Sequence, residues 1–136
     1  MIKFFFFLFF FFLFIGSSVQ AQSVIKMRAK YVSHATYEYG RWSEWSDWDQ
    51  TNILITIDIK DERIKVFAAS TSIFDIYDWE EKSNYNSTIL YFYTIDSEGD
   101  KCRIRFRYSE DEDDRQMYID YPRFSVVYTI KPMRDY

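Results

Sequence analysis

A strict alternation of apolar and polar residues recurs along most of the chain and constrains its fold more than any other feature. In residues 51–60, TNILITIDIK, every odd position from 53 to 59 is isoleucine, and in residues 101–108, KCRIRFRY, basic residues occupy every odd position. Because successive side chains of a strand point to opposite faces of a sheet, this period of two predicts half-buried β-strands.

The same pattern predicts eight strands, at residues 24–39, 51–60, 63–68, 72–79, 88–96, 101–108, 116–121 and 124–131. Short polar connections at residues 60–63, 97–100 and 110–114 favour antiparallel hairpins, and no stretch supports a crossover helix. We therefore expect an all-β, antiparallel up-and-down meander. A small closed or partly open barrel of the lipocalin or calycin type would leave no long exposed edge, and a β-sandwich is the alternative.

An eight-stranded outer-membrane barrel would show a similar alternation. Most of the predicted strands are shorter than the roughly 9–11 residues that a tilted membrane strand needs. The segment ILYFYTI, residues 89–95, is also apolar on both faces, which suits a packed core better than a polar lumen. The sequence therefore favours a barrel with a packed interior.

The first 21 residues have the pattern of a signal peptide. Lys3 precedes an uninterrupted apolar run of residues 4–15, which is shorter than the roughly 20 residues of a membrane-spanning helix. Val19-Gln20-Ala21 then provides a small-x-small cleavage site. We predict a signal peptide at residues 1–21 and a single β-barrel domain at residues 22–136, without a membrane span after cleavage; an uncleaved anchor is the alternative.

Removal of the signal peptide leaves a mildly acidic domain rich in tyrosine. Nine of the 14 phenylalanines lie in the predicted signal peptide, whereas all 12 tyrosines and all four tryptophans lie after it. The remaining 16 basic and 21 acidic residues give a net charge of −5. This acid excess argues against binding to nucleic acid or to anionic membranes. A chain of this size is typical of a single domain, which we expect to be a monomer.

The chain is poorly equipped for catalysis. Its only cysteine, Cys102, shares an alternating face with Ile104 and is predicted to be buried, whereas its only histidine, His34, is predicted on the solvent face of the first strand. One imidazole and one buried thiol make neither a nucleophilic dyad nor a zinc site, and the two glycines after residue 21 cannot form a phosphate-binding loop. We therefore predict no metal, no cofactor and no enzymatic activity. The alternative is a hydrolase that uses two carboxylates, which the sequence cannot assign.

The segment GRWSEWSDW, residues 40–48, places Trp42, Trp45 and Trp48 three residues apart, a spacing that fits neither a strand nor an α-helix. WSEWS matches the WSxWS motif of class I cytokine receptors, and WSEWSDW resembles the tryptophan run of thrombospondin type 1 repeats. The receptor motif belongs near the end of a fibronectin-like domain, and thrombospondin repeats need several disulfides. Both matches are therefore interpreted as coincidental.

Two hypotheses account for these tryptophans. Polyproline II geometry would place the rings on one side at intervals of about 9.3 Å, so that Arg103, Arg105 and Arg107, with Arg41 as a local fourth cation, could insert between them as a structural zipper. Alternatively, the rings stay exposed and form a platform for a sugar or a protein partner.

A wider similarity covers most of the chain after the predicted signal peptide. The order YGRWSEWSDW, ILITIDI, DIYDWEE, TIDSEGDKCRIRF and MYIDY is similar to small exported bacterial all-β proteins of no established function. The resemblance implies a bacterial protein of the periplasm or the extracellular space. It brings no catalytic or ligand-binding residues.

Our leading hypothesis is an exported, non-enzymatic β-barrel that binds a small apolar or aromatic ligand or a partner. The predicted inward face of the first strand combines Tyr31, Tyr37 and Tyr39 with small residues such as Ser33 and Ala35, which could leave room for a ligand inside an eight-stranded barrel. The alternative is a surface module that binds a glycan or a protein through the row of Trp42, Trp45 and Trp48.

Overall fold

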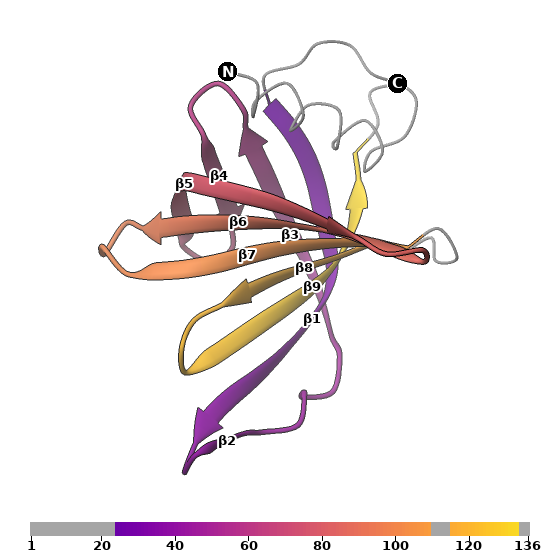
Figure 1. Cartoon of the computed structure of the whole chain (residues 1–136), viewed down its shortest axis with the longest axis vertical. Helices are drawn as coiled ribbons and strands as arrows, with labels where there is room; N and C mark the ends of the chain where they lie inside the picture. Colours follow the sequence, from indigo (N-terminus) through magenta and orange to yellow (C-terminus); the bar gives the residue numbers. More distant parts are fainter. Residues whose placement is uncertain (1–23, 110–114, 134–136) are drawn as a thin grey trace.

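The computed structural model describes residues 24–109 and 115–133 of the chain (Figure 1). The predicted signal peptide and its cleavage site lie outside the described residues. The described part is all-β, with strands β1 (Val24–Glu38), β2 (Arg41–Trp42), β3 (Asp49–Asp58), β4 (Arg63–Phe67), β5 (Thr71–Ser83), β6 (Ser87–Asp96), β7 (Lys101–Ser109), β8 (Arg115–Asp120) and β9 (Phe124–Pro132).

Eight of these strands form a closed antiparallel barrel. They are hydrogen-bonded in the order β1-β3-β4-β5-β6-β7-β8-β9, and β1 pairs with β9 to close the sheet. The two-residue strand β2 is an additional partner at the edge of β1. The predicted meander and barrel are therefore confirmed, and the sandwich alternative is wrong. The prediction missed β2 and ended β5 four residues too early, at position 79.

The interior is filled by the apolar face of every long strand. The largest fully buried side chains belong to Phe92, Phe106, Met27, Ile55, Ile57, Ile64, Leu90, Ile104, Met117 and Ile130. The rings of Phe92 and Phe106 meet edge to face, with 5.7 Å between their centroids. Cys102 is buried among these residues and is a free thiol, as its place in the alternation predicted.

A β-bulge in β1 reverses which of its residues face the interior. The register with β9 shifts between Ala29 and Tyr31, so that Ala29 pairs with Ile130 but Val32 pairs with Tyr128. Directly paired residues of neighbouring strands share a face, so the even-numbered residues of β1 face inward after the bulge. The predicted inward face of the first strand is therefore wrong beyond residue 29.

The three tyrosines that we expected inside the barrel are consequently on its surface. Tyr31, Tyr37 and Tyr39 expose 42%, 37% and 100% of their area. Tyr39 belongs to the two-residue turn that joins β1 to β2, where it and Gly40 both have positive φ, 54° and 80°. This combination is required by the type I′ hairpin, and it places the Tyr39 side chain in solvent. Figure 1 shows β1 extending past the other strands to this turn.

Candidate functional site

The tryptophan segment, residues 42–48, lies beside β1 and is attached to it by serine side chains. The Ser43 amide donates to the carbonyl of Thr36 at 2.8 Å, and the Thr36 amide donates back to Oγ of Ser43 at 3.0 Å. The Ser46 amide donates to the carbonyl of His34 at 2.9 Å, and the His34 amide donates to Oγ of Ser46 at 3.0 Å. Each serine thus exchanges two hydrogen bonds with one residue of β1.

These bonds explain why the tryptophan segment repeats every three residues. Ser43 and Ser46 are three residues apart but bind strand residues that are two apart, and in each case the hydroxyl replaces the backbone carbonyl that a regular strand would offer. A third contact reinforces the attachment, because Oγ of Ser33 donates to the carbonyl of Ser46 at 2.6 Å. Sequence reasoning concentrated on the tryptophans and missed the serines that hold the segment.

The three tryptophans are each about half exposed, at 48%, 45% and 50% for Trp42, Trp45 and Trp48. The Trp42 ring lies 5.5 Å from the ring of Tyr37, which is opposite it in the β1–β2 pair. The rings of Trp45 and Tyr118, on β8, meet edge to face, with 6.0 Å between their centroids. Trp42 and Trp45 therefore lie on the outer face of the barrel wall.

A floor of small side chains lies under this segment. Ser33 and Ala35 pair with Val127 and Ser125, and the latter two pair with Tyr118 and Asp120 of β8. All four small residues belong to the outer face, yet each exposes 5% or less of its area. We attribute their burial to the tryptophan segment above them. Ser33 and Ala35 were predicted to be buried, but they are buried on the opposite face from the one expected.

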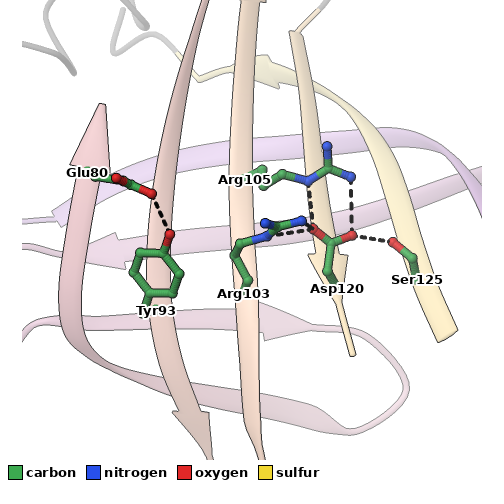
Figure 2. A network of polar contacts seen from close by, with 6 residues as sticks. All are labelled: Glu80, Tyr93, Arg103, Arg105, Asp120 and Ser125. Carbon is green, nitrogen blue, oxygen red and sulfur yellow. Dashed lines mark hydrogen bonds and ion pairs between the residues drawn. The ribbon is translucent and has the colours of Figure 1, made fainter. Parts of the chain in front are cut away.

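Two arginines of β7 and one aspartate of β8 form a polar network beside the floor (Figure 2). Arg105 donates from Nε to Oδ2 of Asp120 at 2.6 Å and from Nη2 to Oδ1 at 3.2 Å. Arg103 donates to Oδ2 from Nε at 3.3 Å and from Nη2 at 3.2 Å. Oγ of Ser125 adds a hydrogen bond to Oδ1 at 2.6 Å. Asp120 therefore orients both guanidinium groups.

The arginines stack on tyrosines. The guanidinium of Arg105 is 4.0 Å from the centre of the Tyr118 ring, and that of Arg103 is 5.3 Å from the centre of the Tyr91 ring. The same Tyr118 ring meets the Trp45 ring, so Tyr118 is shared by Trp45 and Arg105. Tyr118 thus contacts both of these members of the predicted Trp/Arg zipper, and the sequence did not single it out.

The other two arginines of the predicted zipper are placed differently. Arg107 donates from Nη1 to Oε1 of Gln116 at 2.9 Å. Arg41 is exposed in β2, opposite Glu38. Neither Arg107 nor Arg41 lines the groove that Trp42 and Trp45 border, and Trp48 does not line it either.

The tryptophan segment and the arginine network border one groove of about 350 Å³, which we call the outer groove. It is lined by Trp42, Ser43 and Trp45 of the tryptophan segment and by Arg103, Arg105 and Asp120 of β7 and β8. The other lining residues are Ala35, Tyr121, Pro122 and Ser125. The structure therefore brings together four of the residues that the sequence singled out.

A second hollow, of about 620 Å³, lies where β1 and β9 run together, and we call it the mouth pocket. Val32, Val126 and Tyr128 form apolar walls on the inward face of these strands, and His34 and Arg123 add polar groups. His34 was predicted on the solvent face, but the bulge in β1 pairs it with Val126 on the inward face, where it stays exposed. Burial raises the pKa of Tyr128.

The Cys102 thiol belongs to a polar cluster that also contains Tyr121, one of the residues that line the outer groove. It lies 3.1 Å from Oγ1 of Thr94, and burial raises its pKa, which keeps the thiol protonated and unreactive. The hydroxyl of Tyr121 donates to Oδ2 of Asp96 at 2.7 Å. This hydrogen bond lowers the pKa of Asp96, whereas burial, with the same bond, raises the pKa of Tyr121.

Across residues 24–109 and 115–133, no three histidine, cysteine, aspartate or glutamate side chains gather in a metal-binding arrangement. The same residues contain no helix that is long and apolar enough to span a membrane. Comparisons of the chain with protein-family models, with curated proteins and with solved structures found no match. The geometry of the chain itself is therefore the basis for a functional proposal.

Proposed function

We propose that this protein is an exported, non-enzymatic binding module that recognises glycans through the outer groove. One observation carries the proposal: two half-exposed tryptophans and two oriented guanidinium groups border the same hollow. This is the surface alternative that the sequence raised, now limited to Trp42 and Trp45 within the aromatic row.

A sugar suits this combination because its ring has an apolar C–H face and a polar edge. The C–H face can pack against the electron-rich face of an indole ring. The hydroxyl groups can accept hydrogen bonds from Arg103 and Arg105. The volume of the groove is in the lower part of the roughly 300–1,000 Å³ range of small-molecule sites, which suits a short stretch of a glycan.

The groove is also held in place before any ligand arrives. The serine bonds fix the tryptophan segment to β1, and Asp120 fixes the two guanidinium groups. Little ordering entropy is then lost on binding, which favours measurable affinity even for a small contact area. A protein partner would instead need a face of roughly 800 Å².

The proposal is tested by glycan-array screening, followed by calorimetry with Trp45→Ala and Trp48→Ala. Trp48 is the matched control, because it is in the same segment and equally exposed but does not line the groove. We expect Trp45→Ala to weaken glycan binding by roughly tenfold or more, and Trp48→Ala to leave it unchanged. Absence of glycan binding, or capture of a protein partner that depends on Trp45, would contradict the proposal.

The mouth pocket favours a second candidate function, the binding of a small apolar ligand. Its volume of about 620 Å³ is sufficient for a drug-sized molecule, and Val32, Val126 and Tyr128 give it apolar walls. Native mass spectrometry of the purified protein would then show a bound mass that is absent from Val126→Trp, which fills the pocket. A wild-type protein without any bound mass, combined with no uptake of an apolar fluorescent probe, would remove this candidate.

A further inference from the structure

The two arginines of the outer groove have unequal roles. Arg105 exposes 25% of its side chain, makes the shorter bond to Asp120 at 2.6 Å and lies 4.0 Å over the Tyr118 ring. Arg103 exposes 44%, and its bonds to Asp120 are 3.2 and 3.3 Å long. Arg105 is therefore packed into the wall, whereas Arg103 is accessible from the groove.

Asp120 cannot neutralise both guanidinium groups. It accepts five hydrogen bonds, two from each arginine and one from Ser125, whereas a carboxylate offers about four lone-pair sites. Its hydrogen-bonding capacity is thus filled from within the protein, and only 17% of its side chain is exposed. Two positive charges and one negative charge leave an excess of one positive charge in the network.

Glu80, an acid on strand β5 near this wall, is already engaged. Oε1 of Glu80 accepts the hydroxyl of Tyr93 at 2.5 Å and lies 3.9 Å from Nζ of Lys82 (Figure 2). Among the described residues, Asp120 is the one acid that forms an ion pair with Arg103 or Arg105, so the excess charge remains at these arginines in a chain whose formal net charge is −4. A local positive site on an otherwise acidic protein attracts an anionic ligand, whereas most of the remaining surface repels it.

The geometry of Arg103 suits a carboxylate. Its Nε and Nη2 donate to Asp120, whereas its Nη1 has no acceptor among the residues that the structure describes. A guanidinium binds carboxylates through charge-assisted hydrogen bonds in a planar fork, which a neutral hydroxyl cannot match. Trp42 and Trp45 border the same groove, where a sugar ring would pack.

We propose that the outer groove selects glycans that carry a carboxylate, with Arg103 as the cation that contacts it and Arg105 as its anchor in the wall. This inference rests on the proposed glycan-binding function and adds the chemical class of the ligand. The sugar ring packs on the tryptophans, and its carboxylate binds the free edge of the Arg103 guanidinium.

The test uses oligogalacturonate, hyaluronan fragments and sialyllactose, each compared by calorimetry with the same sugar after its carboxyl groups have been reduced. For at least one pair, we expect the wild-type protein to bind the acidic form at least tenfold more tightly, with an affinity that falls as salt rises. Arg103→Gln should abolish this preference and leave the melting temperature nearly unchanged. Arg63→Gln is the control, because Arg63 is similarly exposed, at 40%, and also pairs with an aspartate, but on another wall.

The possible failures are distinguishable. Equal binding of the acidic and reduced forms by the wild-type protein would overturn the acidic-ligand inference and leave glycan binding intact. A preference for acid that survives in Arg103→Gln would overturn the role of Arg103. Absence of binding to every glycan, acidic or neutral, would overturn the proposed function and this inference together.

Discussion

The interior of the barrel and the outer wall beside the tryptophan segment are built from the same strands but are stabilised in different ways. Phe106 is fully buried among apolar side chains, whereas its sequence neighbour Arg105 points outward into a network of named partners. The interior gains stability from apolar area removed from water, which is not directional. The outer wall depends on individual hydrogen bonds and ring contacts, so its geometry is specific.

This difference separates stability from recognition in the molecule. Substitutions inside the barrel should change how much of the protein is folded, with little change in the groove of the folded molecules. Substitutions on the outer wall should alter the groove while most of the folding free energy is kept. Five substitutions test this separation.

Phe106→Ala should have the largest effect, because it removes a ring that packs against Phe92 in the filled interior. We expect a loss of about 3–5 kcal/mol of unfolding free energy, measured by urea denaturation. Phe106→Leu, which keeps most of the volume, should cost less than half as much. A loss below about 1 kcal/mol for the alanine variant would show that the interior is looser than described.

Arg105→Ala should have the next largest effect. It leaves Asp120, which is mostly buried, with fewer donors and removes the cation over Tyr118. We expect a loss of about 1–3 kcal/mol in the same urea measurement. Arg105→Lys keeps the positive charge but lacks the planar fork of guanidinium donors, so we expect an intermediate loss of unfolding free energy. Unchanged stability in both variants would mean that Arg105 does not anchor the wall.

Ser46→Ala tests the attachment of the tryptophan segment. The change removes the acceptor of the His34 amide, and we expect a loss of about 1 kcal/mol together with increased quenching of tryptophan fluorescence by iodide. Ser46→Thr keeps a hydroxyl and is the control. If alanine and threonine variants behave alike, the serine hydroxyl does not hold the segment.

Tyr121→Phe removes the hydrogen bond to Asp96 and should cause a smaller, pH-dependent loss, since Asp96 is in contact with solvent. That bond lowers the pKa of Asp96 in the folded state, so its contribution is fully present above the unfolded pKa of about 3.9 and is lost as the pH falls through the folded pKa. The difference in stability between wild type and variant should therefore be largest at neutral pH and should disappear below about pH 4. A constant difference down to pH 2 would refute this linkage.

Tyr39→Asn should have the smallest effect and the opposite sign. Tyr39 has a φ of 54°, a conformation that asparagine adopts more readily than other residues with a Cβ atom, and its side chain is fully exposed. We expect a gain of about 0.5 kcal/mol in unfolding free energy with unchanged binding in the groove. The Tyr39→Val variant should instead be less stable than the wild-type protein, because valine is β-branched.

The alternation of apolar and polar residues was sufficient to predict the eight barrel strands and most of their faces. The isoleucine face of β3 and the inward position of Cys102 follow directly from the period of two. The alternation could not predict which residues of β1 face inward beyond residue 29, because Lys30 occupies a bulge that no local pattern marks. A single extra residue therefore moved Tyr31 and Tyr37 from the predicted interior to the surface.

The candidate site was only partly predictable for a related reason. The sequence identified Trp42, Trp45, Arg103 and Arg105 by their type and spacing, and the structure places all four around one groove. Their partners Tyr118 and Asp120 carry no distinguishing pattern, because they become neighbours of β7 only through strand pairing.

The sequence by itself determined the strands, the hairpin order and the composition of the two faces, because these depend on neighbouring residues and on the two-residue period of a strand. Only the tertiary structure decided which residues share the outer groove. Closure of the barrel by β1 and β9 places a segment near residue 45 over strands near residues 105, 118 and 125, and such long-range juxtaposition leaves no local trace in the chain.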